Sequence, residues 1–205
     1  MSPTAPARTV PLSTRCALVV TELLAPAVAT AAIGAMVAFA ATPTPASGLL
    51  WAAVAVLFGA AIPLGFLLLG QRRGWWVDHH VPDPAHRRWP IAVAVASVLT
   101  GAAVGAVFHG PVELLVLALV MCATLAVVWA VTDRGGWKVS VHALTAVTGA
   151  TLAALLYGPW AGVPAALAAL AAGWSRVHLR AHTPAQVVAG GLLGATAAIL
   201  FSALT

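Results

Sequence analysis

Residues 112–132 read VELLVLALVMCATLAVVWAVT, and this stretch decides the fold class. Apart from Glu113 it carries no charged side chain, and it matches the length of about 20 apolar residues that a helix needs to cross a bilayer. Because a backbone inside lipid must satisfy its own hydrogen bonds, the α-helix is the default structure for such a stretch. We therefore expect a membrane-spanning helix here.

The composition of the whole chain extends this interpretation to several more spans. Of its 205 residues, 61% are hydrophobic and 7% are charged, whereas soluble domains carry about 25% charged residues. The pattern predicts an all-α, polytopic transmembrane helix bundle of six to seven spans in the cell membrane. It forms a single domain over residues 16–205, after a disordered N-terminal segment at 1–15. The predicted spans are residues 16–40, 49–70, 90–109, 112–132, 139–157, 160–175 and 184–204.

The first span has an alternative interpretation as a secretory signal peptide. Basic residues precede it, and Ala38-Phe39-Ala40 has the small-x-small pattern of a cleavage site. The apolar run at 16–40 is longer, however, than the about 7–15 residues usual for the core of a signal peptide. We therefore expect an uncleaved span.

Basic side chains occupy only one of the two kinds of connection between spans. Every Lys and Arg lies in the segments 1–15, 71–89, 133–138 and 176–183, while the segments 41–48, 110–111 and 158–159 carry no charge. With seven spans, the four basic segments fall on one side of the membrane, which the positive-inside rule assigns to the cytoplasm. A net charge of +5 spread in this way does not form a nucleic-acid-binding face. The expected partners are membrane lipids, not nucleic acid.

The last basic segment and the helix start after it read SRVHLRAHTPAQ, residues 175–186. TPAQ at 183–186 has the order of an N-cap, N1 and N3, a capping-box arrangement, so His182 is expected directly before a helix start. The amides and dipole of a helix start attract anions, and the planar guanidinium of Arg176 suits phosphate oxygens. The alternative is a basic loop end that only sets topology.

A second cluster, WKVSVHA at residues 137–143, opens the fifth predicted span. Lys138 offers a point charge, Ser140 a hydroxyl and an N-cap, and His142 a group that exchanges protons near neutral pH. The alternative is a lysine that extends to the membrane interface beside an ordinary N-cap serine.

The longest connection, residues 71–89, reads QRRGWWVDHHVPDPAHRRW. Its His80, Arg87 and Arg88 supply further cationic donors, and its tryptophans suit the headgroup level of a membrane. The alternative is a basic loop that binds anionic lipid headgroups.

Together the three clusters resemble the motifs of the type-2 phosphatidic acid phosphatase family, which shares its fold with the vanadium haloperoxidases. The motifs of that family are Lys-x6-Arg-Pro, Pro-Ser-Gly-His and Ser-Arg-x5-His-x3-Asp. The corresponding sequences here are the degraded His80-x6-Arg87, then Val139-Ser140-Val141-His142, then Ser175-Arg176-x5-His182-x3-Gln186. The resemblance covers roughly residues 50–204, and the third motif is the specific one.

This resemblance implies a lipid phosphatase that needs no metal and no other cofactor. His182 would attack phosphorus and become phosphohistidine, and His142 would protonate the departing alkoxide. Phosphate oxygens would be held by Arg176, Lys138, Ser140, His80 and one or both of Arg87 and Arg88. Phosphoryl transfer consists mostly of positioning and charge stabilisation, which such residues supply.

Gln186 departs from the family pattern at a position that bears on activity. The family has an aspartate there, which would orient the nucleophilic imidazole; a glutamine carbonyl can accept the same hydrogen bond but carries no charge. Asp78 or Asp133 could supply that charge from a neighbouring connection, and capping of the helix is a further role for Gln186.

Val139 and Val141 stand where the family has proline and glycine. Because a β-branched residue resists positive φ, the phosphate loop of the family cannot form in the same way. We expect Ser140 and His142 to lie on a continuous helix start instead.

The expected function is hydrolysis of a phosphate monoester or diphosphate on a lipid, either phosphatidate-like or polyprenyl. One alternative is a catalytically weak or inactive relative that binds or transports a lipid phosphate, which Gln186 favours. A haloperoxidase is disfavoured by membrane embedding, and a proton-coupled carrier would use Glu22 and Glu113. The four-residue spacing of His178 and His182 is not expected to form a metal site, since Thr183-Pro184 breaks the helix there.

Overall fold

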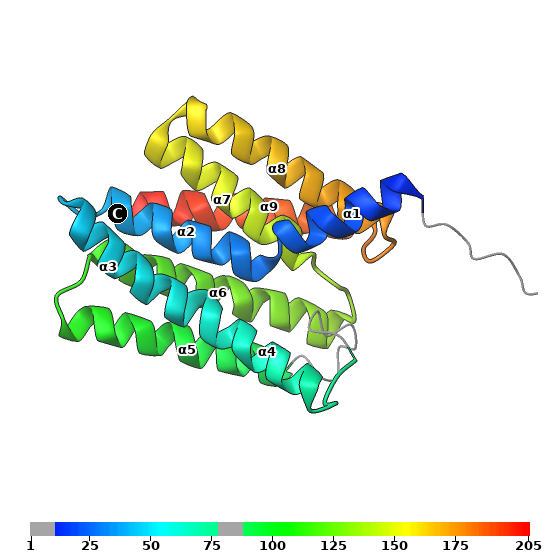
Figure 1. The fold of residues 1–205 in the computed structure, drawn as a ribbon, viewed down its shortest axis with the longest axis horizontal. Helices are drawn as coiled ribbons and strands as arrows, with labels where there is room; N and C mark the ends of the chain where they lie inside the picture. The colour runs from blue at the N-terminus through cyan, green and yellow to red at the C-terminus, as the bar shows by residue number, and fades with distance from the viewer. Residues whose placement is uncertain (1–10, 78–87) are drawn as a thin grey trace, which may run out of the picture.

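The computed structural model describes residues 11–77 and 88–205, and every regular element within these ranges is a helix. The helices pack into one elongated bundle (Figure 1). Four of them are long and apolar enough to cross a membrane, and one bent pair makes a fifth candidate. The all-helical class is confirmed, with four to five candidate spans instead of the predicted six to seven. In the described part of the chain, the candidates do not include α7 (Val141–Tyr157) or α8 (Pro159–His178).

The N-terminal apolar run forms two helices and not the single predicted span at 16–40. α1 (Leu12–Leu23) and α2 (Pro26–Ala40) meet at 44°. Pro26 has no N–H to continue the helix, and its ring disfavours the helical region for Ala25, which has ψ 148°. The break between α1 and α2 is therefore caused locally by Pro26, and the hydropathy pattern did not reveal it.

α1 also begins earlier than expected. The carbonyl of Pro11 accepts the N–H groups of Thr14 at 3.0 Å and Arg15 at 3.1 Å, so the helix includes residues 12–15. The structure thus places residues 12–15 of the predicted disordered segment 1–15 in a helix. Residues 1–10 lie outside the described ranges.

The second candidate span, Pro45–Arg72, contains a change of helix type. It consists of α3 (Pro45–Val56), a π-helical segment η1 (Leu57–Ala61) and α4 (Ile62–Arg72). The Ile62 N–H bonds to the Leu57 carbonyl and Pro63 has no N–H, so neither residue donates to the Phe58 carbonyl. Instead, the Ser97 hydroxyl of α5 (Arg88–Val107) donates to that carbonyl at 2.6 Å. A polar bond thus joins two apolar helices.

Replacing Ser97 with alanine is expected to lower the free energy of unfolding by about 1–2 kcal/mol, because the Phe58 carbonyl loses its donor inside the bundle. The matched control is Thr100→Ala on the same helix, since the Thr100 hydroxyl is exposed and bonds to the Ala96 carbonyl of its own helix at 2.8 Å. Thermal unfolding of both purified variants in detergent measures the difference. Equal unfolding temperatures would contradict a bridging role for Ser97.

α6 (Val112–Gly135), α7, α8 and α9 (Pro184–Leu204) complete the bundle. Figure 1 shows the α6–α7 and α8–α9 connections at one end of the long axis, together with α1. The α2–α3, α5–α6 and α7–α8 turns lie at the opposite end. The two clusters at the starts of α7 and α9 therefore lie at the same end of the bundle.

α7 and α9 are in close backbone contact because glycines face the partner helix. A Cβ added at Gly190 would collide with the Ser140 carbonyl, and one added at Gly194 would collide with the Leu144 carbonyl. The Thr148 hydroxyl of α7 also donates to the Gly194 carbonyl at 3.1 Å. Small residues that let helix backbones approach are typical of helix packing in lipid. Here they bring the start of α7 beside the start of α9.

Candidate functional site

α9 begins with the capping box that the sequence predicted. The Thr183 hydroxyl accepts the Gln186 N–H at 3.3 Å, and Gln186 Oε1 accepts the Thr183 N–H at 3.1 Å. Pro184 is the first helical residue, as expected. The prediction of an N-cap, N1 and N3 at these positions is confirmed, and half-buried His182 lies directly before them.

The oxygen that caps α9 also orients His182. Nδ1 of His182 lies 3.3 Å from Gln186 Oε1. The Thr183 N–H requires the oxygen of the Gln186 amide, and not its NH2 group, at this position, and an amide oxygen only accepts hydrogen bonds. Nδ1 of His182 therefore donates the hydrogen bond to Gln186 Oε1. Gln186 serves both as helix cap and as orienting residue.

α7 begins as a continuous helix, which confirms the expectation for Ser140 and His142. Ser140 is the N-cap, and its side chain accepts the Ala143 N–H at 3.4 Å. His142 is the second helical residue. Both side chains are buried, and Nε2 of His142 is among the buried atoms. Lys138 is half-buried two residues before the cap.

A backbone hydrogen bond joins the two helix starts. The Ser140 N–H donates to the Gln186 carbonyl at 3.2 Å. Gln186 thus orients His182 through its side chain and holds the N-cap of the helix that carries His142 through its backbone. Two clusters that are distant in the sequence come together through one residue.

Arg176 belongs to the same end of the bundle, in the last turn of α8. Its carbonyl accepts the His182 N–H at 3.2 Å, across a tight turn in which Arg180 has a φ of 53°. Its guanidinium contacts α1, with Nη1 3.4 Å from the hydroxyl of Thr21. The backbone of Arg176 is therefore tied to His182, while its side chain is positioned from α1.

Thr21 is a site residue that the sequence analysis missed. It is buried in α1, and its hydroxyl donates to Ser175 Oγ at 3.1 Å while accepting from Arg176. The only signal in the sequence was a hydroxyl inside an apolar run. The contact depends on how α1 packs against α8, which local patterns do not reveal.

Other residues named from the sequence are not part of this arrangement as described. His80, Arg87 and Asp78 lie outside the described ranges, and Arg88 begins α5 without a described side chain. Asp133 is exposed in the last turn of α6. The described residues therefore do not test the first motif of the resemblance, His80-x6-Arg87.

Glu113 and His178 have other surroundings. Glu113 lies in the first turn of α6, at the opposite end of the bundle from the α7 start. The ring of His178 stacks on Trp174 with centroids 5.2 Å apart, and its Nε2 is 3.4 Å from the Thr14 hydroxyl. Among the residues in the described ranges, no group of three His, Cys, Asp or Glu side chains is placed to hold a metal ion.

Comparison with known proteins gives no relative for this chain: no family model, no curated protein and no solved structure matches it. The proposal that follows is based on the geometry of the α7 and α9 starts.

Proposed function

We propose that the chain is a multi-pass membrane lipid phosphatase related to the type-2 phosphatidic acid phosphatases, which its motifs resemble. The observation that carries the proposal is the double role of Gln186. Its Oε1 lies 3.3 Å from His182 Nδ1, and its carbonyl accepts the Ser140 N–H at 3.2 Å. These bonds support a single anion-binding pocket that draws on two helix starts and both histidines.

In the proposed reaction, Nε2 of His182 attacks phosphorus and the bond from phosphorus to the lipid alcohol breaks. His142 gives a proton to the departing oxygen. Water then attacks the phosphohistidine, passes a proton back to His142, and inorganic phosphate leaves as the N–P bond breaks. No oxidant, reductant or second substrate is needed.

The phosphate oxygens are held by cations and by helix-start amides. In the proposal, Lys138 and Ser140 supply donors at the start of α7, and Arg176 supplies them from the last turn of α8. The helix dipoles favour negative charge at the starts of α7 and α9. His80, with Arg87 or Arg88, completes the set in the proposal. The whole arrangement stabilises charge that grows in the transition state.

The membrane arrangement is also part of the proposal. α7 and α8 cross with the other spans, which gives six to seven crossings, and the basic connections face the cytoplasm. A lipid phosphate then reaches the helix starts with its headgroup while its tail stays at the depth of the hydrocarbon.

Replacing Gln186 with glutamate is expected to raise phosphate release by about tenfold or more. The carboxylate keeps the length of the capping side chain and stabilises the positive charge that His182 acquires; in a protease triad, the aspartate-to-amide change costs about 10⁴ in rate. Release of inorganic phosphate from phosphatidate in nanodiscs is the measurement. Gln71→Glu is the control, because it adds the same charge at an exposed position.

Binding or transport of a lipid phosphate without hydrolysis is the second candidate, favoured by the missing negative charge at position 186. Binding or transport would be the supported function if both the wild type and Gln186→Glu bind phosphatidate saturably and neither releases phosphate. An unchanged rate in an active Gln186→Glu variant would limit Gln186 to capping and ring orientation.

A further inference from the structure

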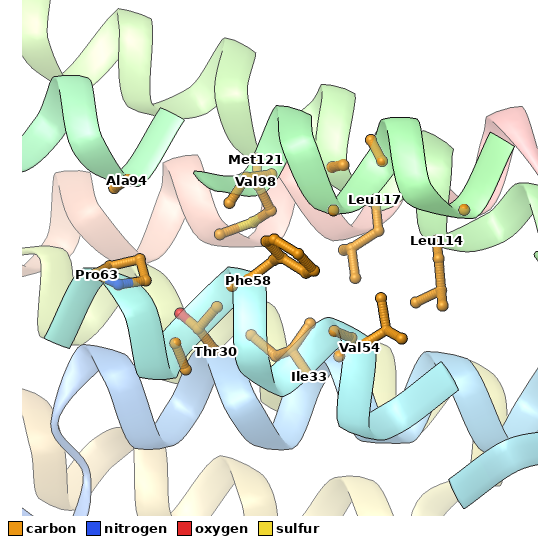
Figure 2. Close-up of a pocket in the computed structure, with 18 of the residues that line it drawn as sticks. Thr30, Ile33, Val54, Phe58, Pro63, Ala94, Val98, Leu114, Leu117 and Met121 are labelled. Atoms are coloured by element: carbon orange, nitrogen blue, oxygen red, sulfur yellow. The ribbon is translucent and has the colours of Figure 1, made fainter. Parts of the chain in front are cut away.

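A cavity of about 450 Å³ lies inside the bundle, and no step of the proposed reaction uses it. It is lined by α2, the Pro45–Arg72 span, α5 and α6 and is partly open to the outside of the bundle; Figure 2 shows the part around Phe58, Leu117 and Met121. Among the described residues that line it there is no Asp, Glu, Lys or Arg. Its volume falls within the range of about 300–1,000 Å³ that is usual for small-molecule sites.

Such a space calls for an apolar occupant. Packed protein interiors contain few voids larger than a water molecule. Water is a poor filler here because each buried water needs about two to four polar partners. Among the described lining residues, the side chains with a polar atom are only Thr30, Trp51, Thr124, Thr145 and His109. A hydrocarbon would restore the dispersion contacts that the lining side chains lack.

One end of the cavity is formed by the first turn of α7. Val141, Leu144 and Thr145 all line it. His142 lies in this same turn, directly after Val141. The apolar space therefore begins at the helix start to which the proposed function assigns the phosphate.

The cavity is longer than one leaflet of a bilayer and shorter than the whole hydrocarbon core. Along α6 its lining runs from Val112 to Leu125, which is about 20 Å at 1.5 Å per residue. The hydrocarbon core of a bilayer is about 30 Å thick, so one leaflet contributes about 15 Å. A single lipid tail of ordinary length fits this space, whereas a long polyprenyl chain exceeds it.

We propose that the cavity holds one hydrocarbon tail of a lipid phosphate whose headgroup lies at the starts of α7 and α9. The identity of the headgroup rests on the proposed function. The tail site narrows the substrate class to lipid phosphates with tails about one leaflet long, such as phosphatidate, and places that tail between helices, not on the outer surface of the bundle.

Photo-crosslinking tests the tail site directly and without turnover. The probe is a phosphatidate with a diazirine at the end of one acyl tail, added to the full chain in phosphatidylcholine nanodiscs. Mass spectrometry should locate the label on the cavity lining of α6, between Val112 and Met121. It should not be concentrated on exposed side chains of α8 such as Val163 and Leu167.

Two control probes define the occupant. A phosphatidylcholine with the same diazirine should label the cavity far less, and equal labelling would overturn the proposal in favour of a structural membrane lipid. A polyprenyl phosphate with a terminal diazirine should also fail to label this end of the cavity. Equal labelling by it would overturn the assignment of leaflet-length tails.

A cavity-filling variant tests the same site through chain-length preference. A Cβ added at Gly105, on the cavity side of α5, would have the Trp51 ring as its nearest neighbour at 4.0 Å, so leucine enters open space. Gly105→Leu should slow phosphate release from dioleoyl-phosphatidate, relative to release from dioctanoyl-phosphatidate, by about tenfold. Ala102→Leu is a second filling variant. Gly65→Leu is the matched control, because Gly65 is exposed with no atom within 4 Å of an added Cβ.

The two readouts separate failure of the tail site from failure of the proposed function. Cavity labelling without phosphate release keeps the tail site and removes the phosphatase. Phosphate release combined with labelling only of Val163 and Leu167 keeps the phosphatase and overturns the tail site. An unchanged chain-length ratio in folded Gly105→Leu and Ala102→Leu also overturns it.

Discussion

Replacing His182 with alanine is expected to reduce phosphate release to background, a loss of at least about 10³-fold. The variant lacks the nitrogen that attacks phosphorus in the proposed reaction, and removal of a covalent nucleophile is among the most damaging changes in enzymes. The fold should persist, because His182 precedes α9 and the capping box between Thr183 and Gln186 remains intact. Phosphate release from phosphatidate, together with the thermal unfolding temperature, measures both effects.

His178→Ala is the matched control for this variant. His178 lies four residues earlier, at the end of α8, is exposed, and has its ring stacked on Trp174. This variant should keep phosphate release close to the wild-type rate. Acid quenching with a phosphate-labelled lipid should trap a phosphoenzyme in the wild type and in His178→Ala but not in His182→Ala. Normal turnover by folded His182→Ala protein would remove the assigned nucleophile.

Replacing Gly190 with alanine is expected to destabilise the protein by about 3 kcal/mol and to abolish activity. The new Cβ would collide with the Ser140 carbonyl, which is backbone and cannot swing aside like the end of a side chain. α7 and α9 would have to separate, and the bond from the Ser140 N–H to the Gln186 carbonyl would be lost. Thermal unfolding and phosphate release measure the two consequences.

Gly191→Ala provides a control at the neighbouring glycine of the same helix. A Cβ there meets only the Cγ2 of Val147, at an ordinary 3.4 Å. Since glycine inside a helix is less favourable than alanine by about 0.5–1 kcal/mol, this variant should be as stable as the wild type or slightly more stable. If both alanine variants unfolded at the same temperature, close contact at Gly190 would not be what holds α7 against α9.

Several features of the fold were predictable because they depend on neighbouring residues. Helical class followed from the apolar runs, and the N-cap roles of Ser140 and Thr183 followed from patterns within one helical turn. The break at Pro26 was equally local, yet hydropathy averaged over 16–40 concealed it. The number of spans does not follow in the same way, because composition alone does not decide whether α7 and α8 cross a bilayer.

The site was predictable only in part. Motif spacing picked out His142, Arg176 and His182, and the sequence placed each of them at a helix end. The position of Thr21 against Arg176 was not foreseeable, because it depends on the packing of α1 on α8. The apolar cavity could not be predicted from the sequence either. Small residues in a span can let two helices pack closely or can leave space between them.

The sequence by itself determined that this chain forms apolar helices and where α7 and α9 begin, because capping bonds and hydropathy act within a few residues. Only the tertiary structure decided that Gln186 joins those two helix starts and that an apolar cavity lies beside one of them. Both results depend on how closely two backbones approach. That distance is set by residues far apart in the chain, such as Gly190, where the absence of a side chain lets the α9 backbone approach the Ser140 carbonyl.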